Sequence, residues 1–179
     1  MNATRLLAAA MVLGTVIGAS QASAQCSGPN SCNTTNTASV VVGNLVKLGM
    51  TSTATTLTAP SADDIDAGLT VGPDAGPTFT IKANRSWTLK IKSGNPTNWT
   101  FAGTGTGVKP ISDLLWATSS AGSYAAITNS DVTFTSGASS TNGATAVPYF
   151  KTQWTADFTS ASNLPGTYSM PIVFTLSAP

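Results

Sequence analysis

The chain has 179 residues, no histidine and a formal net charge of +1 at neutral pH. A charge so close to zero disfavours nucleic-acid binding through a basic field, and the lack of histidine excludes Ser-His-Asp and Cys-His centres. The acidic residues are all aspartates, and the three closest in sequence share one segment instead of facing each other across a substrate. We therefore expect no enzyme activity and no cofactor.

Residues 1–24 have the three parts of a secretory signal peptide. Arg5 supplies the positive charge, residues 6–17 are apolar, and residues 22–24 (Ala-Ser-Ala) match a small-x-small cleavage site. The rival interpretation is an uncleaved membrane anchor, but the apolar run is shorter than the ~20 residues that a spanning helix needs. We expect a mature chain without a membrane span that is secreted to the outside or the cell surface. The pattern is typical of bacteria, in which transit through a periplasm stays open.

Residues 25–37 are polar and unpatterned, which predicts a flexible N-terminal arm. Cys26 and Cys32 lie in it, and in an exported protein such a pair predicts a disulfide. Closing so short a loop contributes about 2 kcal/mol, so the bond would constrain the terminus only. A redox pair or metal site is the alternative, which the lack of a Cys-x-x-Cys motif and of histidine disfavours.

Residues 38–179 carry short alternating segments that predict a single β-sandwich domain. The first segment, residues 38–50, alternates around an interruption at Gly43-Asn44, where we expect a bulge. Its apolar positions are Val40, Val42, Val46, Leu48 and Met50.

Residues 61–76 contain several aspartates among glycine and proline, and this composition predicts a long connection. Asp63, Asp64 and Asp66 could supply carboxylate oxygens to a calcium ion. They lack the spacing of an EF-hand, and the alternative is a solvated turn, because aspartate suits turns.

Residues 79–83 and 87–92 alternate most clearly within the chain. Since only Asn84-Arg85-Ser86 separates them, the pattern predicts a β-hairpin. Further along, residues 111–118 are too few for periodicity to distinguish a helical turn from a strand.

The four tryptophans divide into two pairs by their neighbours. Trp87 and Trp154 share a phase with other apolar residues, which predicts core positions. Trp99 and Trp116 lie next to polar loop residues, which makes them the candidates for exposed rings that stack on sugars. A carbohydrate-binding module is therefore one alternative function.

The last segment, residues 166–179, has apolar residues at every second position. They are Tyr168, Met170, Ile172, Phe174 and Leu176. Pro171 interrupts this strand, and because proline has no N–H for a ladder, we expect an edge strand. Eight or nine short strands without a long helix predict an all-β, antiparallel, immunoglobulin-like β-sandwich with Greek-key connections.

Two stretches carry a resemblance, Trp87-Thr-Leu89 and the closing residues 165–179. They resemble the paired motifs of bacterial WxL-type surface domains, with Phe174 where that family has tryptophan. The closing strand is also similar to that of spore-coat-U-like and fimbrial-type secreted subunits. The first resemblance implies contact with a cell wall. The second implies an immunoglobulin-like subunit that lends a strand to its neighbour.

These observations together predict a non-catalytic structural or adhesive protein of the cell surface. An edge strand and a polar arm before a valine-rich segment suit strand addition between copies or with a surface-assembly partner. The alternatives are an arm that is only a frayed terminus, a glycan-binding module, and a calcium-binding surface domain.

Overall fold

The computed structural model describes residues 27–179. The predicted signal peptide and Cys26 lie outside the described residues, so export and the Cys26–Cys32 disulfide stay predictions. Within the described part, no helix is long and apolar enough to cross a membrane.

One compact unit begins at Val42 and runs to Pro179. The described residues before it, 27–41, contain no helix or strand. The predicted strand over residues 38–50 is therefore present only in its second half, as β1 (Val46–Met50). The alternation is interrupted at Gly43-Asn44, and β1 starts two residues after Asn44.

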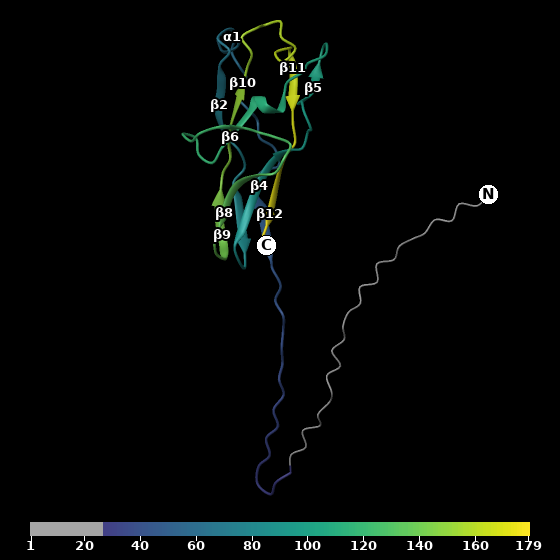
Figure 1. Cartoon of the computed structure of the whole chain (residues 1–179), viewed down its shortest axis with the longest axis vertical. Coiled ribbons are helices and arrows are strands. Elements are labelled where there is room, and N and C mark those ends of the chain that lie inside the picture. The colour runs from purple at the N-terminus through teal and green to yellow at the C-terminus, as the bar shows by residue number, and fades with distance from the viewer. Residues whose placement is uncertain (1–26) are drawn as a thin grey trace, which may run out of the picture. The chain divides into compact units, whose positions relative to one another are not determined.

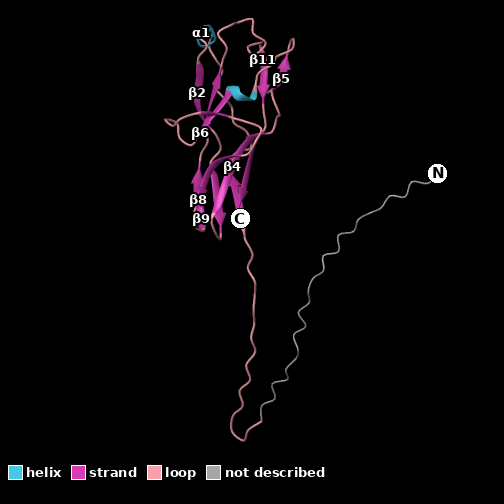
Figure 2. Cartoon of the chain, viewed as in Figure 1, coloured by secondary structure: helices cyan, strands magenta, loops and turns pink. Residues whose placement is uncertain are grey.

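Strands dominate the compact unit, as Figures 1 and 2 show. After β1 they are β2 (Thr70–Ala75), β3 (Phe79–Ala83), β4 (Trp87–Ser93), β5 (Thr100–Gly103), β6 (Leu114–Ala117), β7 (Ala125–Ala126), β8 (Val132–Gly137), β9 (Thr141–Ala146), β10 (Tyr149–Gln153), β11 (Gly166–Ser169) and β12 (Ile172–Ser177). The helical elements are the short α1 (Ala62–Asp66) and the 3-10 turn η1 (Ile111–Asp113).

The strands pair antiparallel throughout and build two layers. In the first layer the orders are β1-β3-β9 and β2-β10-β6-β7. The β2–β3 and β9–β10 links run side by side between these two sheets, since the N–H of Gly76 donates to the carbonyl of Pro148 at 2.7 Å. In the second layer the orders are β12-β4-β8 and β11-β5, again joined along the chain.

Aromatic side chains hold the layers face to face. The rings of Phe79 on β3 and Phe174 on β12 lie 4.3 Å apart between centroids, and those of Trp116 on β6 and Phe134 on β8 lie 5.8 Å apart. Both pairs join a strand of one layer to a strand of the other. The predicted all-β, antiparallel sandwich is confirmed.

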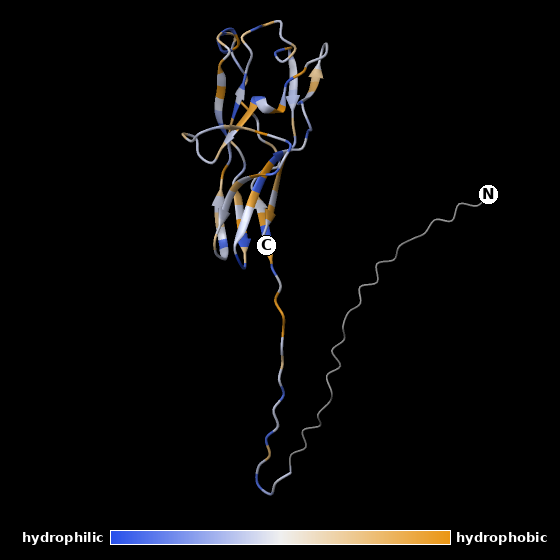
Figure 3. Cartoon of the chain, in the orientation of Figure 1, coloured by the Kyte–Doolittle hydropathy of each residue, from blue (hydrophilic) through white to orange (hydrophobic). Residues whose placement is uncertain are grey.

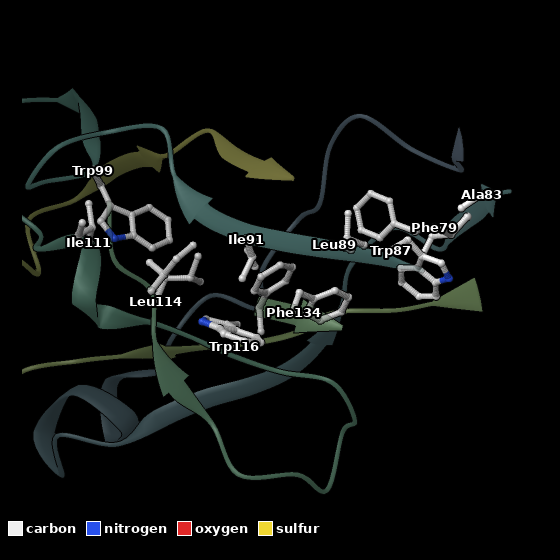
Figure 4. Close-up of a cluster of buried hydrophobic side chains, with 13 residues drawn as sticks. Phe79, Ala83, Trp87, Leu89, Ile91, Trp99, Ile111, Leu114, Trp116 and Phe134 are labelled. Carbon is white, nitrogen blue, oxygen red and sulfur yellow. The ribbon is translucent and has the colours of Figure 1, made fainter. Parts of the chain in front are cut away.

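Alternation decides which side chains enter the core. In β3 and β4 every second residue is buried, and Figure 4 shows Phe79, Trp87 and Leu89 gathered at one end of this core. Phe174 and Leu176 pack against it from β12 while staying half-buried. The phase predicted for these strands is confirmed.

The predicted hairpin through Asn84-Arg85-Ser86 is wrong. β3 and β4 belong to different layers, so this short connection is a corner between sheets. The Asn84 side chain fastens the corner: its Nδ2 donates to the carbonyl of Gly43 at 2.8 Å, and its Oδ1 accepts from the N–H of Leu45 at 2.9 Å.

The predicted connection over residues 61–76 instead contains α1 and β2. Ser61 and Asp64 begin the helix with a capping box, in which each side chain binds the other residue's backbone N–H. In residues 111–118 both alternatives occur in turn, since η1 is followed directly by β6.

We predict that Leu89→Ala lowers the free energy of unfolding by about 2 to 5 kcal/mol, because Leu89 is fully buried between the layers. The control is Thr175→Ala on the outward face of β12, with an expected change within about 0.5 kcal/mol. Urea denaturation followed by tryptophan fluorescence measures both. Equal effects of the two changes would contradict the inward phase of β4.

Candidate functional site

The second layer ends in an unpaired strand edge. β12 pairs with β4 alone, and β11 pairs with β5 alone, so one side of each strand has no hydrogen-bonded partner strand in the described part of the chain. Met170 and Pro171 lie between β11 and β12, where the strand is interrupted. The predicted edge position of the last strand is confirmed.

A groove of about 830 Å³ follows this edge. Its other wall is formed by Met50 at the end of β1 and by residues 52–60, which contain no helix or strand. The apolar face of the edge lines the groove through Tyr168, Met170, Ile172 and Phe174. These side chains are only half-buried, because no further strand covers them.

Three side chains, Trp99, Lys109 and Trp154, line the groove near its end at β11. The Lys109 side chain is 1% exposed, and its Nζ lies 3.0 Å from Asp113 Oδ2 and 2.6 Å from the carbonyl of Gln153. The same Nζ lies 3.9 Å from the centroid of the Trp154 ring. Burial lowers the pKa of Lys109, and the Asp113 carboxylate opposes that shift.

Two indole N–H groups at this end are buried without an acceptor among residues 27–179. They are Nε1 of Trp99 and Nε1 of Trp154. A buried donor without an acceptor costs about 1 to 3 kcal/mol. The buried hydrogen-bond donors at this end of the groove are therefore less well paired than those in the rest of the core.

The structure corrects the prediction of exposed tryptophans. Trp99 and Trp116 are 9% and 8% exposed and belong to the core, as Figure 4 shows. The polar neighbours of Trp99 in the sequence suggested exposure. The backbone N–H of Trp99 instead donates to the carbonyl of Lys109 at 2.8 Å, which places its segment against the residues before η1. Trp154, which was assigned to the core, is half-buried and lines the groove.

The structure places Asp63, Asp64 and Asp66 on α1 and not in a loop. The Asp64 carboxylate accepts hydrogen bonds from the hydroxyl and the N–H of Ser61, and these bonds lower the pKa of Asp64. Among residues 27–179, no group of three or more His, Cys, Asp or Glu is placed to hold a metal. The calcium site stays a prediction.

Comparison with known proteins gives distant structural similarities only. No family model matches the sequence, and no curated protein matches it. A chain from a chaperone-usher pilus, described for the molecular basis of its rod uncoiling, has a TM-score of 0.49 and 11% identity, covering 87% of this chain and 100% of its own.

The P pilus rod subunit PapA is also similar to this chain. It has a TM-score of 0.47 and 14% identity, covering 74% of this chain and 97% of its own. Since both TM-scores are below 0.5, the function of this chain is inferred from its own geometry.

We predict that Lys109→Met lowers the free energy of unfolding by about 3 kcal/mol, because it leaves the carboxylate of Asp113 and the carbonyl of Gln153 without their donor. The matched control is Lys92→Met. Lys92 pairs with Asp131 at 3.1 Å, but both side chains are about one-third exposed, so the expected loss is below about 1 kcal/mol. Urea denaturation of both variants measures the difference, and equal losses would show that Lys109 does not fasten this end of the groove.

Proposed function

We propose that this chain is a structural subunit of a cell-surface assembly, in which the valine-rich segment of one copy adds as a strand to the free edge of another. The observation that carries this proposal is the groove along β11 and β12. It has the form left when a sandwich lacks one strand: an unpaired backbone edge beside an apolar face that is half-buried.

The edge supplies both kinds of interaction that a strand needs. Its backbone N–H and C=O groups on the side away from β4 and β5 can pair with an incoming backbone. Its side chains present an apolar surface, in which Ile172 and Phe174 point toward the core. Pairing would therefore satisfy backbone groups and cover apolar area at the same time.

The chain also contains a segment suited to fill this groove. Val40, Val41 and Val42 are 86%, 95% and 67% exposed, and Leu45 is 61% exposed. This stretch before β1 is visibly hydrophobic in Figure 3. In an extended strand Val40 and Val42 point the same way, so they would face the groove together.

Burial supplies a driving force of useful size. Moving a valine side chain from water into an apolar site contributes about 1.5 to 3 kcal/mol. Two valines would thus contribute several kcal/mol before the cost of ordering the segment is subtracted. A tail that serves only as a linker gains nothing from three consecutive exposed valines.

Binding of sugars receives no support from the tryptophans, since the two candidates are in the core. The groove itself presents a half-buried apolar surface formed by Tyr168, Met170, Ile172 and Phe174. An occupant of the groove must therefore be apolar and extended, which fits a peptide strand.

We predict that the double variant Val40→Asp/Val42→Asp abolishes self-association of the chain, because burying either carboxylate in the apolar groove is unfavourable. Analytical ultracentrifugation of the exported protein, over a range of concentrations, measures the association state. The unfolding free energy should not change, since both valines are exposed.

The matched control is Val132→Asp at the start of β8, which is also exposed but lies outside the groove. It should associate like the unmodified chain. Association of the Val40/Val42 variant at normal strength, or a strictly monomeric unmodified chain, would refute strand addition.

A further inference from the structure

Asn142 is the one asparagine of the chain that is followed by glycine. It lies in β9, and both Asn142 and Gly143 are exposed. Among residues 27–179 its side chain has no hydrogen-bond partner. The side chains of Asn84, Asn95 and Asn163, in contrast, each donate to a backbone carbonyl. The amide of Asn142 is therefore free to rotate toward its own backbone.

β9 bulges at Gly143. Asn142 lies opposite Lys82 of β3, and the next paired residue of β9 is Ala144. Gly143 is thus the extra residue of a bulge, and such a residue is left unpaired. β9 is also the last strand of its sheet, so its other side has no partner strand in the described chain. The backbone nitrogen of Gly143 therefore lies outside the regular ladder.

The local backbone leaves room for an attack by that nitrogen. Gly143 has a φ of +142°, and a Cβ placed on it would meet nothing within 4 Å. Glycine adopts a positive φ without the penalty that a side chain would add. The N–H of Ala144 donates to the hydroxyl of Thr141 at 3.1 Å, a local bond that competes with the ladder. The segment is thus open where the side chain of Asn142 meets the next backbone nitrogen.

Two lysines place positive charge beside Asn142. Lys82 lies directly opposite it on β3, and Lys47 of β1 lies opposite Lys82. All three are exposed and form one row on the outer face of the sheet. Like charges opposite each other destabilise a sheet, whereas an opposite charge in the row would stabilise it. Neither lysine has a carboxylate partner among residues 27–179.

We infer that Asn142 is a site of spontaneous deamidation, which converts the neutral end of this row into a carboxylate that pairs with Lys82. The backbone nitrogen of Gly143 loses its proton and attacks Cγ of Asn142. A C–N bond forms, and the side-chain nitrogen leaves as ammonia. Water then adds to the succinimide ring and opens it, which gives aspartate or isoaspartate at position 142. The reaction consumes one water and needs no oxidant or reductant.

The lysines act on the reaction and on its product. The attacking nitrogen and the intermediate that it forms carry negative charge, and a nearby ammonium favours the charged form of a group. Lys82 therefore lowers the barrier to ring formation through its charge. After the ring opens, the same ammonium faces a carboxylate, which offsets its repulsion by Lys47. The formal net charge of the chain falls from +1 to zero (+1 − 1) with this conversion.

This inference is independent of strand addition. Asn142 and Gly143 do not line the groove, and the reaction needs only water and the folded chain. It adds a slow, irreversible change of surface charge that depends on the age of the molecule. A structural protein that stays in place for a long time would accumulate the converted form.

The test incubates the exported full-length chain in mildly alkaline buffer at physiological temperature. Peptide mass spectrometry measures conversion at each asparagine, and electron-transfer fragmentation distinguishes aspartate from isoaspartate. The internal control is Asn129, which is exposed in a loop and is followed by Ser130. We expect Asn142 to convert at least ~10-fold faster than Asn129, a ratio that needs a barrier difference of about 1.4 kcal/mol. Equal rates at the two asparagines would overturn the inference.

Substitutions of Lys82 test the role of its charge. Lys82→Met should slow the conversion of Asn142 about 3-fold, the size expected for one nearby charge in water. Lys82→Arg should keep the original rate, because it keeps the charge. The same incubation in urea provides a reference without structure, and we expect the folded chain to convert at least as fast as the unfolded one. A folded chain that converts more slowly would show that β9 protects Asn142, and equal rates for Lys82→Met and Lys82→Arg would exclude the assigned role of Lys82.

A second measurement tests the pairing in the product. Asn142→Asp supplies the carboxylate directly, and it should raise the urea midpoint of the unmodified chain. The same substitution in a Lys47→Met/Lys82→Met background should give no such rise, because the positive partners are gone. An identical shift of the midpoint in the two backgrounds would contradict pairing of the new carboxylate with Lys82.

Discussion

The unpaired edge of β11 and β12 is the constraint on which the rest of this structure depends. A sandwich is stable when both inner faces are covered, and here the core is dense around Phe79, Ile81 and Leu89. It thins toward Ile172 and Phe174, which remain half-buried. Residues 52–60, which follow β1, close the far side without forming a strand, and the uncovered space between them and the edge is the groove.

Two features near the groove show how its ends differ. At the end near β11, Lys109 joins Gln153 and Trp154 to η1 through Asp113. At the opposite end the corner with Arg85 holds the chain just before β1. The Lys109 contacts thus lie at one end of the groove, and the chain that carries the exposed valines joins the unit at the corner with Arg85.

Much of the fold could be predicted from alternation alone. Period-two patterns identified β3, β4 and β12 and the inward phase of Trp87, Leu89 and Phe174, because inward residues are apolar at every second position. Proline in the last segment indicated an edge for a physical reason, the missing N–H. These signals are local. The alternation within a strand decides which of its residues face the core, whichever strand it pairs with.

The predictions that were wrong concern features that tertiary contacts decide. A three-residue connection suits a hairpin and a corner between sheets equally well, and the difference lies in the bonds of Asn84 to the chain before β1. Trp99 looked exposed because its neighbours are polar, yet backbone pairing with Lys109 carries it inward. Lys109 itself gave no signal, since a lone lysine between valine and proline, just after a glycine-rich stretch, is ordinarily a surface residue.

The most direct measurement of strand addition is amide hydrogen exchange of the edge in the dissociated and the associated protein. Residues 166–177 should exchange quickly on their free side in the dissociated chain and become protected on association, while the already paired β3 and β4 change little. Association that leaves the protection of residues 166–177 unchanged would contradict the account, because the copies would then be joined through some other surface.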